Sequence, residues 1–486
     1  MKKVFIALTI IFNLIMTKNV FSSSLLDSTP NGFYLDDEKV LIVSEAERSL
    51  NFVIIELWPI GEKYVFLPEI KKPAKGVSDK EMTELRKNIY WINFEFTHGN
   101  IIRKFPHYTK IFVALPKSVG DLEKKFFIEY LKTKCSFTDD DIKNRIYFFD
   151  TNSNLHWTQD TCEIIGRDEK GRIIIGMAKS DFAKYLSAIK SMVSTYNSLF
   201  TIKWFEENTS AEGGDEEIVT MPDGKPALLV GRHRIMRYIE LQHEVPSDTD
   251  TPYEKWMVEE ARTAYSNSVY GLPVHIIPEN LLYNRQLGTD EIFHLDMYLV
   301  ILPNKHKSKA FVPIYDKNEI MDILSRQLLD KEFIKRCNEE YNAVAGQMSE
   351  LGFEVVRIPF YDHPVRNPAN VAKFRNKETG KTTVLLSKYP YHLSKNGDLS
   401  PQQKMQDALY SLEDNLVAWK EKPDKKTYTN IFNAINNLFY MLEEEEKTQN
   451  PIAEKQAEIY RKYGYDVILV QSYAWGAGGL HCSLLY

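Results

Sequence analysis

The chain has 486 residues, of which 43% are hydrophobic and 26% are charged, and this is the composition of a folded globular protein. The formal net charge of -6 at pH 7 argues against a protein that binds nucleic acid through charge and is compatible with a cationic substrate. Four cysteines are too few for a disulfide-rich scaffold, and none has the spacing of a zinc ligand. The sequence leaves open one disulfide among Cys135, Cys162 and Cys337.

The first 22 residues have the pattern of an export signal. Two lysines precede an apolar stretch over residues 4–16, and a cleavage pattern follows at residues 20–22. The apolar stretch is too short to span a bilayer comfortably, so a signal peptide is favoured over a membrane anchor. We therefore expect residues 1–22 to be removed and the mature protein to be secreted or periplasmic, with no membrane partner.

In chain order, buried apolar runs then alternate with amphipathic stretches. Strands are expected at residues 51–58, 64–67, 109–116, 145–149, 173–175, 227–231, 274–277, 293–302, 354–358, 382–387 and 466–470. Helices are expected at residues 78–87, 120–134, 181–197, 253–265, 320–351 and 452–463. This order predicts an α/β chain of about five strand–helix–strand modules without a literal sequence repeat. The charged stretch 400–447 interrupts the last module as a helical hairpin, and its acidic run 443–446 is expected to be a solvated helix face.

A glycine-rich stretch leads to a cysteine close to the end of the chain. Glycines at positions 476, 478 and 479 follow the apolar run 467–470 and precede Cys482. Glycine lets a second backbone or a ligand come close, and a cysteine held there becomes nucleophilic when its thiolate is stabilised. Taken alone, Cys482 is equally explained as a buried residue that packs as a small hydrophobe. On extended backbone the adjacent His481 points to the other side, so we do not assign it to acid–base chemistry.

Three further motifs share a position in a loop or at a strand end, where function is commonly carried. They are Trp157-Thr158-Gln159-Asp160-Thr161-Cys162-Glu163, Glu212-Gly213-Gly214-Asp215 and His294-Leu295-Asp296. If His294 and Asp296 lie on a strand, alternation puts both side chains on the same face. Each motif alone also has a structural explanation, as a turn cap, a hairpin or a structural histidine. Cys162 has no glycine-shaped approach and is assigned to packing.

Together and in this order, the motifs resemble those of the guanidino-group-modifying enzyme superfamily, which has the pentein fold, a five-bladed α/β-propeller. Its members include arginine deiminases, agmatine deiminases, protein-arginine deiminases and amidinotransferases. The resemblance runs from about residue 109 to residue 486, and it implies a catalytic domain over residues 91–486 with the helical insertion at about 400–447. Residues 23–90 match no module and stay unassigned. The first motif looks most like protein-arginine deiminases, and the other two look more like free-arginine deiminases.

The resemblance implies a role for each motif residue. Cys482 would attack the guanidinium carbon, His294 would protonate the departing ammonia and then activate water, and Glu212 would orient His294. A guanidinium is planar and permanently cationic, so carboxylates can hold its N–H donors in paired bonds. The residues assigned to this substrate binding are Asp160, Asp296 and Asp215.

The resemblance also raises the question of a metal. Gln159 and Glu163 match positions that help to bind calcium in the protein-arginine deiminase pattern. Calcium takes six to eight oxygen ligands, and two such residues do not make a site. We therefore predict no cofactor and keep calcium at Gln159 and Glu163 as an alternative.

The sequence thus predicts an exported deiminase that converts arginine, in peptides or proteins, to citrulline and ammonia through a covalent thiouronium intermediate. The partner is an arginine-containing peptide or protein, or a small guanidino compound. The alternatives are a deiminase of free arginine or agmatine, an amidinotransferase with the same residues, a non-catalytic binding protein on the same fold, and a Cys–His peptidase. For free arginine, one of Arg232, Arg234 and Arg237 would hold the substrate carboxylate, although a structural basic cluster explains them equally.

Overall fold

The computed structural model describes most of the chain between residues 32 and 471. The described residues are 32–35, 37–57, 74–117, 119–151, 162–178, 183–211, 213–245, 252–283, 292, 294–304, 307–315, 331–360, 367–388, 401–447 and 450–471. The predicted signal peptide, the strand expected at residues 64–67 and the C-terminal Cys482 lie outside these ranges. Within the described ranges, none of the helices combines the length and the apolar character that a membrane span requires.

The described strands form five sheets, and four of these sheets share one plan. In each of the four, the first strand runs antiparallel to the second, and the third lies parallel to the second after a helical crossover. Their strands are β6 (Glu163–Asp168), β7 (Ile173–Met177) and β8 (Phe200–Trp204); β9 (Glu216–Thr220), β10 (Pro226–Gly231) and β11 (Val274–Ile277); β12 (Val300–Leu302), β13 (Lys309–Tyr315) and β14 (Glu354–Phe360); and β15 (Ala372–Arg375), β16 (Thr382–Lys388) and β17 (Asp466–Gln471).

The N-terminal residues complete two of the sheets. The fifth sheet is all parallel and contains β3 (Phe52–Glu56), β4 (Lys110–Pro116) and β5 (Ile146–Thr151). The short strands β1 (Phe33–Leu35) and β2 (Val40–Ile42) extend the β6 sheet. The segment that matched no module in the sequence therefore contributes backbone to two sheets of the main body.

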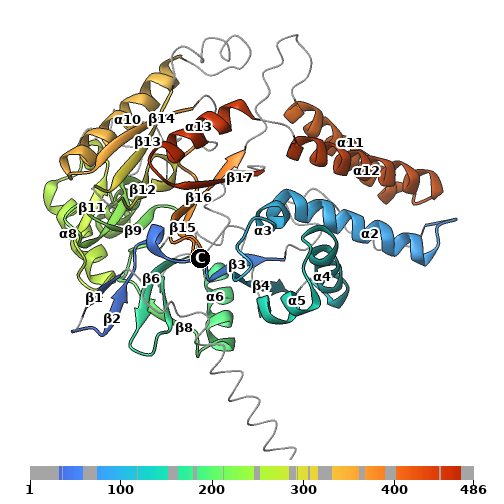
Figure 1. Cartoon of the computed structure of the whole chain (residues 1–486), viewed down its shortest axis with the longest axis horizontal. Helices are drawn as coiled ribbons and strands as arrows, with labels where there is room; N and C mark the ends of the chain where they lie inside the picture. Colours follow the sequence, from blue (N-terminus) through green and yellow to red (C-terminus); the bar gives the residue numbers. More distant parts are fainter. Residues whose placement is uncertain are drawn as a thin grey trace, which may run out of the picture.

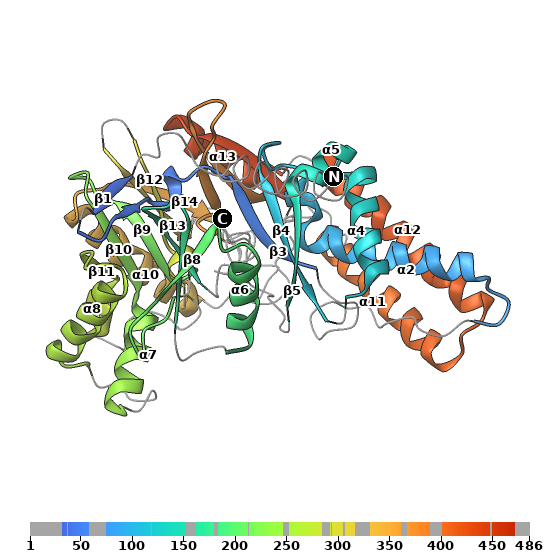
Figure 2. The ribbon, with the colours of Figure 1, turned by 90° about the horizontal axis from the view of Figure 1, so that it is seen from below.

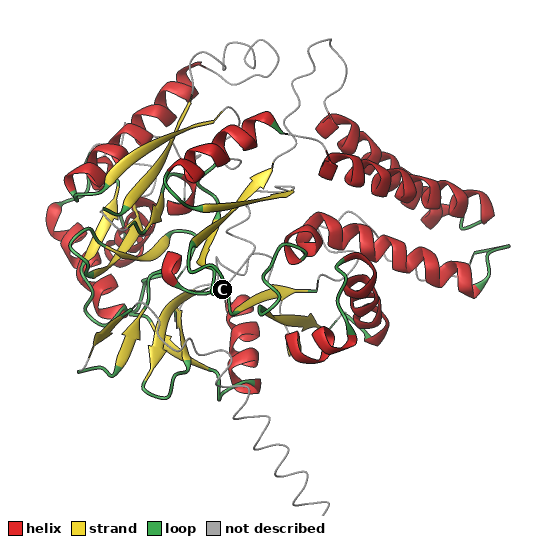
Figure 3. Ribbon diagram, in the orientation of Figure 1, coloured by secondary structure: helices red, strands yellow, loops and turns green. Residues whose placement is uncertain are grey.

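The helices lie on the outside of the sheets, as Figure 3 shows. The crossover helices are α4 (Asp121–Lys134), α5 (Asp139–Arg145), α6 (Ala183–Thr195), α7 (Arg232–His243), α8 (Lys255–Ser268), α10 (Lys331–Glu350) and α13 (Pro451–Lys462). Local sequence fixes several of their starts, because Asn450 caps α13 in front of Pro451, and Thr138 and Asp141 form a capping box on α5. The mixed α/β class predicted from the sequence is confirmed.

Five hydrophobic clusters join the sheets in pairs. Each cluster takes buried residues from two sheets, and four of the five pairs are consecutive in the chain, from β3–β5 to β15–β17. Representative pairs are Ile54 with Ile175, Ile174 with Leu228, Leu229 with Val312, and Phe311 with Leu386. The remaining cluster joins the last sheet to the first through Leu385 and Ile55. Figure 1 shows the same order, with the sheets following one another around the view.

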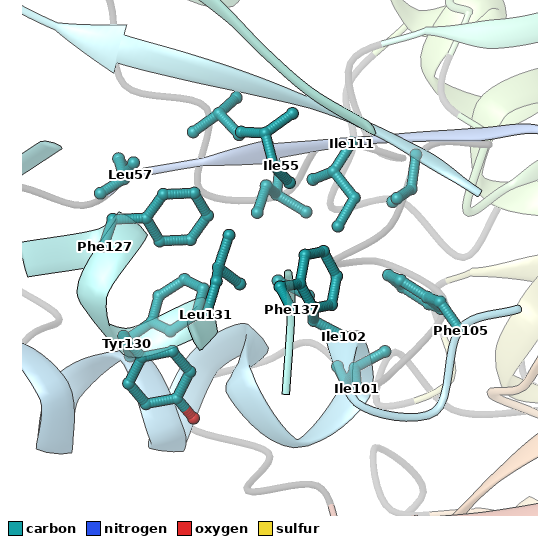
Figure 4. Close-up of a cluster of buried hydrophobic side chains, with 14 of the residues drawn as sticks. Ile55, Leu57, Ile101, Ile102, Phe105, Ile111, Phe127, Tyr130, Leu131 and Phe137 are labelled. Carbon is teal, nitrogen blue, oxygen red and sulfur yellow. The ribbon is translucent and has the colours of Figure 1, made fainter. Parts of the chain in front are cut away.

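Figure 4 shows the cluster that joins the last sheet to the first. Ile55 of β3 and Ile111 of β4 point toward Phe127 and Leu131 of α4, and all four side chains are fully buried. At roughly 25 cal/mol per Å² of buried apolar surface, side chains of this size each stabilise the fold by about 1.5–3 kcal/mol. These packed interfaces fix where the strand ends lie relative to one another.

A sixth cluster belongs to a helical projection. It packs α2 (Asp79–Phe94) against α11 (Pro401–Glu421) and α12 (Lys425–Lys447), and Figures 1 and 2 show these three helices side by side, away from the sheets. The hairpin expected at 400–447 corresponds to α11 and α12. Glu443, Glu444 and Glu446 of its acidic run are exposed. Two of them also pair with basic residues, since Glu446 lies 3.4 Å from Lys104 and Glu443 lies 3.5 Å from Lys134.

Two kinds of expectation differ from the structure. The predicted strand at residues 293–302 is wrong in its first half, because Leu295–Met297 form a 3-10 turn, η5, and only Val300–Leu302 are extended. The strands β1, β2, β6, β8, β9, β13 and β15 were not predicted. Most of them carry charged or polar residues within the strand and lack the long apolar run that signals a buried strand.

Candidate active site

The described motif residues gather at one edge of the sheets. Because each first strand is antiparallel to the second, it begins where the second strand ends: Glu216 pairs with Val230, and Glu163 pairs with Gly176. Asp215 directly precedes β9, and Asp296 lies just before β12. In open α/β sheets, ligands bind outside the carboxyl ends of the parallel strands. This edge is therefore the candidate active site.

Four of the assigned residues lie outside the described part of the chain. They are Cys482, Asp160, Glu212 and Gln159. His481 lies outside it as well. Their roles remain predictions. The described part of the site contains Asp215, His294, Asp296 and Glu163.

The η5 turn is held by the segment that contains the Glu-Gly-Gly-Asp motif. The backbone N–H of Asp296 donates to the carbonyl of Gly214 at 3.0 Å, and the N–H of Leu295 donates to Oδ1 of Asp215 at 2.9 Å. His294 and Asp296 are both buried, with about 7% of their surface exposed. Two motifs separated by some 80 residues are thus bonded to each other, and the turn, rather than strand alternation, sets the directions of the imidazole and the carboxylate.

Asp215 is a fully buried carboxylate with protein contacts on both oxygens. Oδ1 accepts from Leu295, and Oδ2 lies 3.1 Å from Nε of Arg234. Burial raises the pKa of Asp215 to about 8; the nearby His294 and the Leu295 amide act in the opposite direction, and the carboxylate of Asp296 adds to the rise. The sequence assigned Asp215 to the substrate, but its contacts are those of a residue that positions the His294 turn.

Gly231 is required by this arrangement. Its N–H donates to the backbone carbonyl of Asp215 at 2.8 Å, and a Cβ added at Gly231 would overlap Oδ1 of Asp215. The same Cβ would lie 3.0 Å from the hydroxyl of Tyr298, which donates to the carbonyl of Ile277 at 2.7 Å. Only glycine allows the end of β10 to approach the buried carboxylate this closely.

Asn370 is a site residue that the sequence reasoning missed. Its Nδ2 donates to Oδ2 of Asp296 at 2.9 Å, and both side chains are buried. Asn367 supports the same turn, because its Nδ2 donates to the carbonyl of Met297 while its Oδ1 accepts from the N–H of Ala369 at 2.6 Å. Asn370 precedes β15 as Asp215 precedes β9. The signal in the sequence was a polar turn, Asn367-Pro-Ala-Asn370, before a strand that was not predicted.

Two of the three arginines considered for a substrate carboxylate are used within the protein. Arg232 lies in a buried ion pair with Glu340, with Nε 3.0 Å from Oε1, which ties α7 to α10. Arg234 faces Asp215, and Arg237 is exposed. A buried guanidinium whose carboxylate partner is already in place is poorly suited to bind a second carboxylate.

Glu163 is also engaged by a cation. It is almost fully buried, and its Oε1 lies 2.9 Å from a guanidinium nitrogen of Arg48. Among the described residues, no group of three His, Cys, Asp or Glu side chains is placed to hold a metal ion. Cys162 is buried, and no disulfide joins any two of Cys135, Cys162 and Cys337.

Comparison with known proteins adds structural neighbours. The chain is similar to solved structures of arginine-modifying enzymes. A protein from Porphyromonas gingivalis assigned as an arginine deiminase aligns with 13% identity and a TM-score of 0.43 over 91% of this chain and 97% of that one. The N-terminal domain of ArgZ, bound covalently to a reaction intermediate, aligns with 10% identity and a TM-score of 0.31 over 89% and 96% of the two chains.

A second ArgZ structure, of a cyanobacterial arginine dihydrolase with its substrate, aligns with 11% identity and a TM-score of 0.20 over 45% of this chain and 76% of that one. No family model matches the chain, and no curated protein matches it.

Proposed function

We propose that this protein is a guanidinium hydrolase, a deiminase that converts arginine to citrulline and ammonia, with Cys482 as its nucleophile. One observation carries the proposal: the His294–Asp296 turn is bonded to Gly214 and Asp215 on one side and to Asn370 on the other. Motif segments far apart in the chain therefore meet around the imidazole of His294 and the carboxylate of Asp296. A cationic, planar group is a ligand that such a carboxylate suits.

The proposed chemistry balances with water as the second substrate. Asp160 and Asp296 hold the guanidinium, and the Cys482 thiolate adds to its carbon. His294, oriented by Glu212, gives a proton to the departing nitrogen, so that the C–N bond breaks and ammonia leaves a thiouronium adduct. His294 then takes a proton from water, whose oxygen adds to the same carbon. The C–S bond then breaks and the remaining hydroxyl proton passes to solvent or to the released ammonia, which restores the thiolate and leaves a neutral ureido group.

The finer parts of the proposal rest on separate observations. The five sheets and the ring of clusters that joins the last sheet to the first support a five-bladed pentein arrangement. The engagement of Arg232 by Glu340 and of Arg234 by Asp215 leaves neither offered to a free α-carboxylate, which favours arginine within a peptide or protein. The N-terminal pattern of residues 1–22 favours export.

The test is an activity assay on residues 23–486 with three substrates: free arginine, agmatine and a peptide with an internal arginine and blocked ends. We expect ammonia and a ureido product in equal amounts, with the peptide turned over fastest, and no activity in Cys482→Ala. Peptide mapping of an acid-quenched reaction should find the adduct on Cys482. Transfer of the amidino group to an added amine without ammonia would identify an amidinotransferase, and new amino termini would identify a peptidase.

Two results would remove the proposal. One is turnover that survives in Cys482→Ala. The other is an experimental structure in which Cys482 lies more than about 10 Å from His294, which is beyond hydrogen-bonding or one-water reach.

A further inference from the structure

The N-terminal turn before β3 contacts three of the sheets through charged or polar side chains. Glu45 Oε2 lies 3.1 Å from Nζ of Lys373 on β15, and the hydroxyl of Thr220 on β9 donates to Glu47 at 2.6 Å. Arg48 lies 2.9 Å from Glu163, the first residue of β6. Residues 45–48 thus contact the sheets that begin with β15, β9 and β6. In the sequence, Asn370, Asp215 and Asp160 precede these three strands.

Arg48 is built into this position. Its Nε donates to the carbonyl of Val43 at 3.1 Å, and one of its terminal nitrogens reaches both Glu163 and the carbonyl of Ile164. The side chain of Arg48 is 9% exposed and that of Glu163 is 1% exposed, so the pair is almost sealed from water. The backbone carbonyl of Arg48 also accepts from the N–H of Arg375 at 2.7 Å, which fixes the turn to the end of β15.

Glu163 needs a cation because its carboxylate is almost completely buried, with 1% of the side chain exposed. An ionised carboxylate at such a depth is costly unless it is paired and hydrogen-bonded. A guanidinium carries a permanent charge and several fixed donors, so it can balance a buried carboxylate at every physiological pH. A calcium ion beside Glu163 would lie next to this positive charge. Calcium takes six to eight oxygen ligands, and within the described part of the chain no group of three His, Cys, Asp or Glu side chains is placed to hold a metal ion.

We propose that the guanidinium of Arg48 pairs with Glu163 in place of a calcium ion, and that this pair positions the start of β6. Glu163 follows Asp160 by three residues in the sequence. The start of β6 would then be held by an ion pair between two segments of the chain, without a metal. The effect on turnover rests on the proposed function, whereas the absence of calcium binding does not.

The first experiment measures calcium itself. The mature protein, after treatment with EDTA, is titrated with CaCl₂ by calorimetry, and its Tm is recorded with CaCl₂ and with EDTA. A site that binds calcium only in the folded state would raise Tm with calcium concentration. We expect no heat of binding and the same Tm. Calcium binding that is lost in Glu163→Gln would overturn the proposal, whether or not the protein is a deiminase.

The second experiment tests Arg48 as a positioning residue with Arg48→Lys, Arg48→Met and the double variant Arg48→Met with Glu163→Gln. We expect Arg48→Met to lower kcat/KM at least about tenfold, as loss of an outer partner commonly does. Arg48→Lys keeps the charge and should recover part of this loss. The double variant leaves no unbalanced carboxylate, so it should fold even if Arg48→Met does not.

The matched control is Arg172→Met, which removes the Arg172–Asp168 ion pair at the opposite end of the same hairpin, where the two groups lie 2.7 Å apart and are more exposed. We expect it to change kcat/KM less than twofold. Equal kinetics in wild type and in a folded Arg48→Met would overturn the positioning role. If the wild type hydrolyses no guanidinium substrate, the proposed function fails, and the calcium titration still decides whether Arg48 stands in for the metal.

Discussion

The protein contains two buried groups of charged residues that are built on opposite principles. At the N-terminal turn Lys373 contacts two buried carboxylates, because its Nζ lies 2.8 Å from Glu217 of β9 and 3.1 Å from Glu45 of the turn. At the candidate site, Asp215 and Asp296 lie near His294, and Asp296 is held by the neutral amide of Asn370. In the first group one lysine contacts both carboxylates, whereas in the second Asp215 faces Arg234 and Asp296 accepts a hydrogen bond from a neutral amide.

The difference appears in how the two groups titrate. Burial acts to lower the pKa of Lys373, but Glu217 and Glu45 outweigh it and the net shift is upward, so the lysine stays charged. Burial raises the pKa of Asp215 to about 8, which brings its proton exchange into the physiological range. A fixed ion pair suits a structural connection, whereas a carboxyl whose pKa lies near 8 can change its charge in the physiological pH range. Substitutions in the group around Lys373 and in the group around Asp215 and Asp296 should therefore have different effects on stability and on turnover.

Replacement of Lys373 should have the largest effect. Lys373→Met leaves Glu45 and Glu217 buried without their cation, and removal of one member of a buried ion pair costs about 3–5 kcal/mol. We expect a loss of this size in the free energy of unfolding in urea. Adding Glu45→Gln and Glu217→Gln should restore most of it. A loss below about 1 kcal/mol, typical of an exposed pair, would show that Lys373 does not stabilise the fold as a buried partner of Glu45 and Glu217.

Gly231→Ala should damage the candidate site and the fold together. The new Cβ would overlap the carboxylate of Asp215, and overpacking of a buried site costs about 1–3 kcal/mol. We expect a lower Tm and a loss of turnover. The control is Gly346→Ala in α10, where a Cβ meets nothing within 4 Å and alanine should stabilise the helix by up to about 1 kcal/mol. If Gly231→Ala and Gly346→Ala have the same Tm and the same turnover, the close approach of Gly231 to Asp215 does not support the site or the fold.

Asn370→Leu should lower turnover more than stability. It removes the donor that holds Oδ2 of Asp296, and a hydrogen bond to a charged group contributes about 1.5–3 kcal/mol, or roughly 10-fold to 100-fold in kcat/KM. The control is Asn376→Ala, in an exposed turn where the side chain caps the N–H of Glu378 at 2.9 Å. Its kcat/KM should stay at the wild-type value. If kcat/KM is unchanged in Asn370→Leu, Asn370 does not contribute to turnover through Asp296.

Asp215 gives the most gradual and most specific effect, a change in stability that amounts to about 1 kcal/mol for each pH unit. Its pKa in the folded protein, about 8, lies above the ordinary value of about 3.9 in an unfolded chain. The folded state therefore holds the proton more tightly, and this contribution is complete at low pH and is lost as pH rises toward 8. Compared with Asp215→Asn, the wild type should lose on the order of 1 kcal/mol per pH unit between pH 5 and pH 8.

Chemical denaturation of both proteins across this pH range measures the difference. A difference that stays constant with pH would mean that Asp215 is ionised throughout, as a partner of Arg234, and that both groups of charges are balanced in the same way.

The motifs and the missed residues show where sequence reasoning stops. Glu212-Gly-Gly-Asp215 and His294-Leu-Asp296 were found because they combine reactive residues with glycine or with close spacing. Asn370 has no such signature, since an asparagine in a turn before a strand is ordinary. Its importance comes from Asp296, 74 positions away. Arg48 and Glu163 are 115 positions apart, and neither residue alone indicates the pair.

The sequence by itself determined the α/β alternation, most of the apolar strands and the helical hairpin, because hydrophobic periodicity and local capping are encoded in neighbouring residues. Only the tertiary structure decided that Asp215 faces Arg234 and Leu295, that Asp296 lies on a turn, and that Arg48 balances Glu163. The reason is physical. A buried charge needs a partner, and that partner is supplied by whichever segment the packing of the sheets brings near, at any distance along the chain.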